Sequence, residues 1–193
     1  RQRGTLVCGI NGQLPGFSSL GADGRYTVFA SDASNLVAGD TNGVRDIFLF
    51  DSQTSLVRRL NLSQQGVQAT APSEHPTLSG NGRQAAFASD AANLVIGDVN
   101  GFTDLFAVDT LTGAIALQTL AADGTQANGS SFRPMLSHTG RFLVFESTAT
   151  NLVAGGTAPG VSHVYLRDRD VSNSGILDTP GNTATVLVDL APG

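Results

Sequence analysis

A segment that recurs three times constrains this chain more than any other feature of its sequence. The first copy, residues 21–51, reads GADGRYTVFASDASNLVAGDTNGVRDIFLFD, and the second, residues 80–109, reads GNGRQAAFASDAANLVIGDVNGFTDLFAVD. A weaker third copy occupies residues 137–168. The step is constant, since 58 residues separate Gly24 from Gly82 and Gly82 from Gly140. A fixed period of this size is typical of proteins that stack one supersecondary unit several times.

Each copy predicts four short antiparallel strands. A tight turn at Asp23-Gly24, Asn81-Gly82 or Thr139-Gly140 joins the first strand to the second, and the first two of these turns are strong hairpin signals. The first and second strands are expected at residues 18–21, 75–79 and 133–137, and at 25–31, 83–89 and 141–147. The third and fourth are expected at residues 46–50, 104–108 and 162–166, and at 55–60, 114–120 and 183–190. No window holds apolar residues at helical spacing for three turns, so helix is not expected.

Repeats of four strands are the pattern of β-propeller blades. A sandwich also has many short strands, but it would not repeat them at a fixed period. The predicted fold is therefore all-β, with three four-stranded antiparallel blades at about residues 17–62, 75–121 and 133–190 in one domain of residues 1–193. Residues 3–10 predict one extra strand of the fourth kind.

Three blades cannot close a ring, because propellers have about four to eight blades. The chain is therefore expected either to be a piece of a longer propeller or to form a homodimer of 3 + 3 blades in a six-bladed ring. Open blade faces and strand edges favour such association. The extra strand at residues 3–10 favours a fragment. The first residues also contain no initiator Met and no apolar signal segment, so a mature or truncated product is expected.

The repeat carries several short motifs: Pro-x-Leu-Ser at residues 76–79, Asp-Gly-Arg at 23–25, Phe-Ala-Ser at 29–31 and a final Asp51. In these motifs the chain resembles the TolB-type (WD-repeat-like) β-propeller repeats of bacterial exported proteins, over about residues 5–190. The insertion of Asn-Leu-Val and Gly-Asp-x-Asn-Gly-x-x-Asp resembles a long-loop subgroup found in large secreted proteins. The resemblance implies a propeller, secretion or export to the periplasm, and a binding or scaffolding role. Such propellers also accompany hydrolase domains, so the alternative is an accessory propeller of a larger exported hydrolase or peptidase.

Composition limits the classes of partner. The net charge is −5, and the eleven basic residues, all Arg, form no cluster larger than a pair, so nucleic-acid binding is not expected. No apolar run approaches the roughly 20 residues that span a bilayer, so no membrane partner is expected. The single Cys8 allows neither an internal disulfide nor a zinc site. His75, His138 and His163 lie in no catalytic motif, so the chain is not expected to be an enzyme. The identity of a protein or small-molecule ligand is left open.

Acidic loops between the second and third strands are the candidate metal sites. Carboxylate and amide oxygens around a glycine turn are the ligands that Ca²⁺ prefers. The candidate ligands, four in each loop, are Asp32, Asp40, Asn42 and Asp46 in the first copy and Asp90, Asp98, Asn100 and Asp104 in the second. The third copy loses all four donors together, having Thr148, Gly156, Ala158 and either Ser162 or His163 in their places. The alternative is that these residues only cap turns and strands.

Two further features involve carboxylates. The loop that starts at Asp168 resembles a degraded EF-hand loop, with Asp168, Asp170 and Asp178 as weaker Ca²⁺ candidates and Thr179 where a bidentate Glu would complete the site. Separately, an Arg begins the second strand and an Asp ends the third strand in every copy. Because these strands are expected to be antiparallel neighbours, each blade is predicted to contain a structural Arg–Asp pair. The predicted pairs are Arg25–Asp51, Arg83–Asp109 and Arg141–Asp168.

Overall fold

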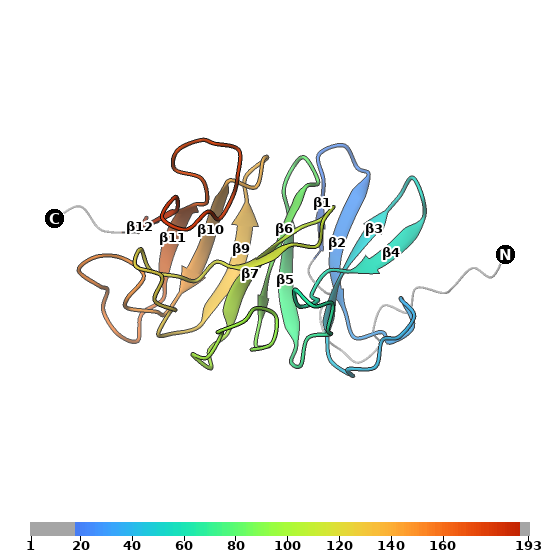
Figure 1. Cartoon of the computed structure of the whole chain (residues 1–193), viewed down its shortest axis with the longest axis horizontal. Coiled ribbons are helices and arrows are strands. Elements are labelled where there is room, and N and C mark those ends of the chain that lie inside the picture. Colours follow the sequence, from blue (N-terminus) through green and yellow to red (C-terminus); the bar gives the residue numbers. More distant parts are fainter. Residues whose placement is uncertain (1–17, 190–193) are drawn as a thin grey trace.

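The computed structural model describes residues 18–189, which form twelve strands and no helix. The strands make three four-stranded antiparallel sheets that stand side by side along the molecule (Figure 1). Blade 1 consists of β1 (Ser18–Leu20), β2 (Tyr26–Ser31), β3 (Asp46–Asp51) and β4 (Leu56–Arg59). Blade 2 consists of β5 (Ser73–Leu78), β6 (Gln84–Ser89), β7 (Asp104–Asp109) and β8 (Ile115–Leu117). Blade 3 consists of β9 (Ser131–Leu136), β10 (Phe142–Ser147), β11 (His163–Asp168) and β12 (Ala184–Leu187).

Strand order within each sheet follows the sequence, so each sheet is a simple meander. The predicted all-β class with three four-stranded blades is confirmed. The strand expected at residues 3–10 and Cys8 lie outside the described residues. Within residues 18–189 no helix is long and apolar enough to cross a membrane.

An aromatic pair occupies the same register position in all three blades. Phe29 lies opposite Phe48, Phe87 opposite Phe106, and Phe145 opposite Tyr165. Their ring centroids are 5.7, 6.0 and 5.6 Å apart, and the rings are stacked. The repeated aromatic positions of the sequence therefore have one structural role, which is to build the centre of each blade.

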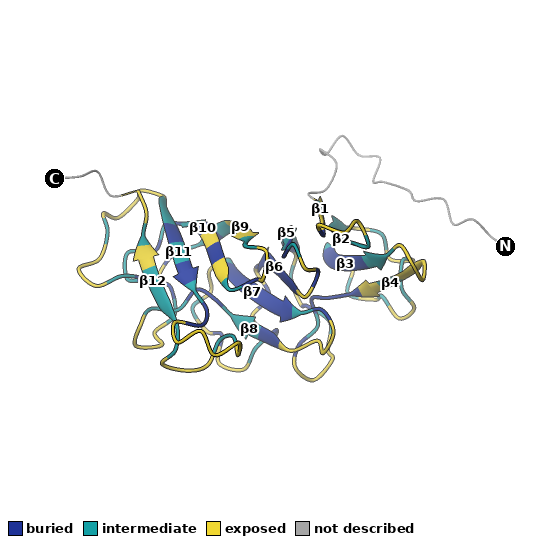
Figure 2. Ribbon diagram, turned by 90° about the horizontal axis from the view of Figure 1, so that it is seen from above, coloured by how far each residue is buried: buried dark blue, intermediate teal, exposed yellow. Residues whose placement is uncertain are grey.

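The hydrophobic cores lie between neighbouring blades. Val28 and Leu49 of blade 1 pack in one cluster with Phe87 of blade 2, and Leu105 packs in a second cluster with Leu143 of blade 3. Strand β6 is buried along its whole length, and β7 is dark blue in Figure 2. The middle blade is thus covered on both faces, as in a propeller.

The Asn-Leu-Val motif, which recurs in every copy of the repeat, has a structural role. Asn93 donates from Nδ2 to the carbonyl of Gln68 at 2.8 Å and accepts from the backbone N–H of Thr70 at 3.1 Å. Asn151 makes the equivalent bonds to the next connector, at 2.8 and 3.0 Å. Leu94 and Leu152, which follow these Asn residues, are buried in the cores. Each motif therefore fixes the segment that arrives from the preceding blade.

The turn glycines are a second contact between blades. Gly82 has φ +71°, and a Cβ built there would lie 2.8 Å from the ring of Tyr26 in the preceding blade. In the same way, a Cβ built on Gly140 would lie 2.5 Å from Cγ of Gln84 in blade 2. The corresponding residue of blade 3, Phe142, is 38% exposed.

Blade 3 presents an open apolar face at the end of the array. Val144 and Val188 are 37% and 55% exposed, whereas their counterparts two repeats earlier in blade 1, Val28 and Leu60, are 0% and 4% exposed. Val186 of β12 adds a third exposed apolar side chain, at 51%. Strands β10 and β12 accordingly carry exposed segments in Figure 2.

Candidate functional site

The acidic loops connect β2 to β3 in blade 1 and β6 to β7 in blade 2. The third strand of each blade begins with the last Asp of its loop, Asp46 or Asp104, and both side chains are fully buried. A buried carboxylate requires compensation by charge or by hydrogen bonds. The two blades provide this compensation differently.

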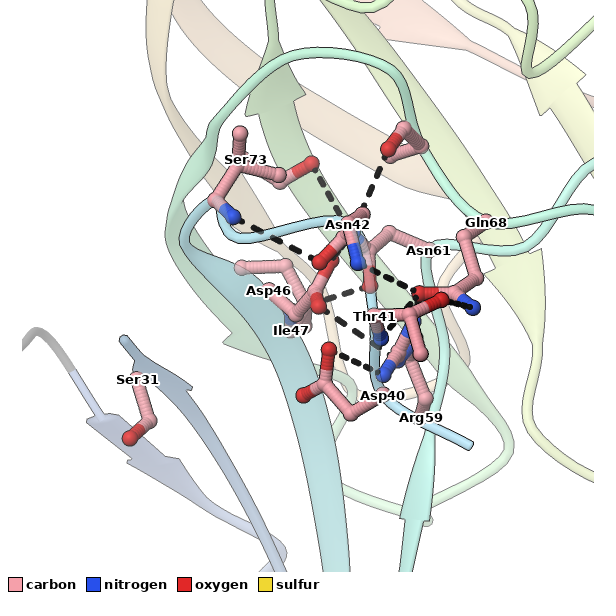
Figure 3. A network of polar contacts seen from close by, with 12 residues as sticks. Ser31, Asp40, Thr41, Asn42, Asp46, Ile47, Arg59, Asn61, Gln68 and Ser73 are labelled. Carbon is pink, nitrogen blue, oxygen red and sulfur yellow. Dashed lines mark hydrogen bonds and ion pairs between the residues drawn. The ribbon is translucent and has the colours of Figure 1, made fainter. Parts of the chain in front are cut away.

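In blade 1 the compensating cation is Arg59. Its Nη2 lies 2.8 Å from Oδ1 of Asp40, and its Nε lies 3.4 Å from Oδ2 of Asp46 (Figure 3). These three side chains are at most 4% exposed. Arg59 reaches the loop because β4 pairs with β3, which places Arg59 opposite Phe48.

Neutral groups complete the blade 1 network. Asp46 accepts from Asn61 at 2.7 Å and from Asn42 at 3.0 Å. Gln68 accepts from Nη1 of Arg59 at 2.6 Å and donates to the carbonyl of Gly39 at 2.7 Å. The guanidinium therefore contacts three oxygens, from Asp40, Asp46 and Gln68. The space between the two carboxylates is filled by the protein's own cation.

In blade 2 the same scaffold is present without the arginine. The residue at the register position of Arg59 is Leu117, which lies opposite Phe106 and packs against the hydrophobic core. Gln126 accepts from the backbone N–H of Val99 at 3.2 Å and donates to the carbonyl of Gly97, as Gln68 does with its own loop.

Asp98 and Asp104 are 9% and 0% exposed and take part in no ion pair of the described chain. The hydroxyl of Thr119 donates to Oδ1 of Asp104, and Asn100 also donates to this carboxylate. Oδ2 of Asp104 has no hydrogen-bond partner within residues 18–189. Burial raises the pKa of Asp104 to about 6, and burial likewise raises the pKa of Asp98.

In blade 3 a histidine replaces the buried Asp at the start of the third strand. The register pairs Ser147 with His163, as Ser89 pairs with Asp104, so His163 rather than Ser162 is the counterpart of the strand's first Asp. Nδ1 of His163 lies 3.2 Å from Asp189, which occupies the place of Thr119. The third copy therefore retains a polar pair here, with the imidazole on the third strand and the carboxylate after the fourth strand.

The earlier acidic residues of each loop bind elsewhere. Asp32 forms an ion pair with Arg45 at 2.6 Å. Asp90 accepts from the hydroxyl of Thr103 at 2.6 Å. Both carboxylates are exposed, and the structure joins each of them to the residue just before β3 or β7.

The loop after β11 divides its three acidic residues among different partners. Asp168 pairs with Arg141 at 2.8 Å, and Asp178 pairs with Arg169 at 2.5 Å. Burial alone would raise the pKa of Asp170, but the N–H groups of residues 174 and 175 and the side chains of residues 174 and 182 lower it below its ordinary value. The loop lines a cavity of about 640 Å³ against blade 2. Its carboxylates organise the loop rather than converge on one point.

The predicted Arg–Asp pair is confirmed in every blade. The distances are 2.9 Å for Arg25–Asp51, 2.7 Å for Arg83–Asp109 and 2.8 Å for Arg141–Asp168. The hydrogen bond from Arg25 lowers the pKa of Asp51 to about 2. Because the pair recurs in each blade, its role is structural.

The inner strands form a groove that the sequence patterns did not indicate. It has a volume of about 410 Å³ and is lined by residues of β1, β5 and β9, among them His75 and Arg133. These two residues have φ of 52° and 51°, which is uncommon for residues other than glycine, and each lies where a bulge shifts the strand register. Backbone strain of this kind tends to occur at functional sites. The sequence signal for this groove was the proline that follows each of these residues, Pro76 and Pro134, which are 58 residues apart.

Comparison with known proteins identifies the fold. No protein-family model matches the chain, and no curated protein matches it. Among solved structures, TolB from Agrobacterium tumefaciens superposes with a TM-score of 0.51 at 18% identity, over 93% of this chain and 61% of that one. The tricorn protease superposes with a TM-score of 0.54 at 14% identity, over 91% of this chain and 17% of that one. TolB from Acinetobacter baumannii gives 0.48 at 19% identity, over 85% and 31%.

These likenesses concern architecture. The chain has the fold of TolB-type β-propeller blades, which confirms the resemblance inferred from the repeat. It spans less than two thirds of each of these proteins. Residues 18–189 thus form three blades of the propeller type.

Proposed function

We propose that this chain is a non-enzymatic binding or scaffolding module that acts within a complete six-bladed ring, built from three blades of each of two copies. The observation that carries the proposal is the open face of blade 3. Val144, Val186 and Val188 are exposed there. In blade 1, Val28 occupies the position of Val144 and Leu60 occupies the position of Val188, and both are buried between blades. A second copy would remove this apolar surface from water.

Ring closure has a defined geometry. Tyr26 lies on Gly82, and Gln84 lies on Gly140, so the next contact of this series places Phe142 on the Gly24 of a second copy. Gly24 has a positive φ and no neighbouring atom within 4 Å of a built Cβ. Two such contacts, related by a two-fold axis, would close the ring.

The groove along the inner strands is the proposed ligand surface. In a closed ring the first strand of each blade faces the centre, so His75 and Arg133 would present their side chains there. The ligand is a protein or a small molecule rather than a nucleic acid, in keeping with the net charge of −5. Following the resemblance, the protein acts in the bacterial periplasm or outside the cell.

Sedimentation velocity at micromolar concentrations tests the assembly. The unmodified chain should sediment as two copies, and Phe142→Glu should sediment as one, because it places a charge in the closing contact. Leu111→Glu is the matched control, since Leu111 is 73% exposed on the turn between β7 and β8. A dimer that persists in Phe142→Glu would refute the proposed geometry.

A second candidate is an accessory propeller of a larger exported hydrolase or peptidase. It is favoured by the likeness to the tricorn protease, of which this chain spans only 17%. The coding sequence on both sides of the chain discriminates between the two. A catalytic domain in the same reading frame would support the second candidate, and its absence would support the first.

A further inference from the structure

Blades 1 and 2 carry the same arrangement of oxygens, and blade 1 holds a cation within it. In blade 1 the guanidinium of Arg59 contacts Asp40, Asp46 and Gln68 at 2.6 to 3.4 Å. The equivalent residues of blade 2, one repeat later, are Asp98, Asp104 and Gln126. We propose that blade 2 binds a Ca²⁺ ion between Asp98 and Asp104, at the place that the guanidinium of Arg59 occupies in blade 1.

The supporting scaffold is the same in both blades. Asn42 donates to the carbonyl of Ala69 at 3.2 Å, and Asn100 donates to the carbonyl of Ala127 at 3.1 Å. The loop geometry therefore survives the loss of the arginine. Two residues differ around the buried Asp: Thr119 replaces Asn61 as a neutral donor, and Leu117 replaces Arg59 and brings no charge to the site.

An unpartnered buried atom points to the ligand. Oδ2 of Asp104 has no hydrogen-bond partner within the described chain, and the residue is fully buried. The equivalent atom of Asp46 also accepts no hydrogen bond, but it lies 3.4 Å from Nε of Arg59 in an ion pair, which Asp104 lacks. Two buried carboxylates without a cation are unfavourable, because a buried charge needs a partner.

The donors suit a hard divalent cation. They are two carboxylates and the amide oxygen of Gln126, with water able to complete the six to eight oxygens that Ca²⁺ takes. Exposed loop residues such as Val99, at 84%, surround the site, so an ion has a short path to it. With two carboxylates the expected Kd is about 10⁻⁴–10⁻³ M, the range of extracellular calcium modules. Blade 3 is not expected to bind, because His163 replaces the acid.

Calcium titration of the full chain, after removal of metal by a chelator, tests the proposal above neutral pH. Calorimetry should give one Ca²⁺ per chain, and saturating calcium should raise the midpoint of thermal unfolding by at least about 5 °C. Leu117→Arg, which copies blade 1, should abolish both responses. Asp104→Asn should also abolish them, whereas Asp90→Asn, an exposed carboxylate of the same blade, should leave them unchanged.

Three results would overturn the proposal. They are the absence of heat and of a thermal shift in the unmodified chain, an equal shift produced by sodium chloride of the same ionic strength, and calcium binding by Leu117→Arg with unchanged affinity. The site lies within one blade. A failure to bind calcium would therefore be distinguishable from a failure to close the ring, because calorimetry measures the first and sedimentation measures the second.

Discussion

At the scale of single residues, the most consequential difference between the repeats is Arg59 in blade 1 and Leu117 in blade 2. Both occupy the same place opposite the blade's stacked aromatic residue. Arg59 neutralises carboxylates that are almost inaccessible to water, whereas Leu117 only packs. This one difference between the repeats thus decides whether the buried carboxylates of the loop have a cationic partner.

Arg59→Leu should therefore destabilise the protein in metal-free buffer by about 3–5 kcal/mol, because it leaves two buried carboxylates without a cation. Leucine already occupies the equivalent position in blade 2, so its shape is compatible with the fold. The neighbouring exposed Arg58→Leu is the control and should change stability by less than about 0.5 kcal/mol. Urea unfolding measures both, and equal effects of the two substitutions would contradict this assignment.

Asp104 produces the opposite pH dependence from an ordinary ion-paired aspartate. Its pKa is raised to about 6 in the folded state, from 3.8, so the folded protein binds this proton more tightly than the unfolded protein does. In metal-free buffer its contribution to stability is largest below pH 3.8 and is lost as the pH rises towards about 6.

Asp104→Asn should remove this dependence. The expected gain in stability above pH 6, in metal-free buffer, is about 1–3 kcal/mol. At a pH near 3.8, the ordinary pKa of aspartate, the substitution should change the free energy of unfolding little. Unfolding free energies measured over this pH range, with Asp90→Asn as control, would contradict the interpretation if Asp104→Asn were equally destabilising at every pH.

At the scale of elements, the connectors between blades depend on the Asn that begins each Asn-Leu-Val motif. Asn93→Ala would leave the backbone N–H of Thr70 and the carbonyl of Gln68 without their side-chain partner. The expected loss of stability is about 1–3 kcal/mol. Gln65→Ala, an exposed position on the same connector, should be nearly neutral. Thermal unfolding of the two variants provides the comparison.

The strands near the centre of each blade could be predicted from the sequence because the repeat and the alternation of side chains agree there. Strands β2, β3, β6 and β7 lie within one residue of their expected bounds. The Arg–Asp pairs were also predictable, because antiparallel neighbours bring Arg25 and Asp51 together. Strand β8 is shorter than expected, since its end passes into a buried polar segment at Gln118 and Thr119.

The charge balance of the acidic loops was not predictable from the loops themselves. Arg59 lies 13 residues after Asp46 and approaches it only through the pairing of β3 with β4. Of the four candidate residues, Asp40, Asn42 and Asp46 share one network in the structure, whereas Asp32 pairs with Arg45. The sequence analysis did not include Arg59, which lies between the two buried carboxylates. A comparison of Arg59 with Leu117 across the repeat was the available signal.

At the scale of the whole molecule, stability in a repeat array comes from the blades and from the interfaces between neighbours. Blade 2 has a neighbour on each side and contributes to both cores. Blade 3 has one covered face and one face that exposes Val144 and Val186. A second copy of the chain that covers this face would complete the proposed ring.

The molar mass of the unmodified chain, measured by light scattering over a range of micromolar concentrations, tests this most directly. A ring of two copies predicts a mass of twice 19.8 kDa that persists on dilution. A mass of 19.8 kDa at every concentration would show that three blades exist alone in solution, and it would contradict the ring.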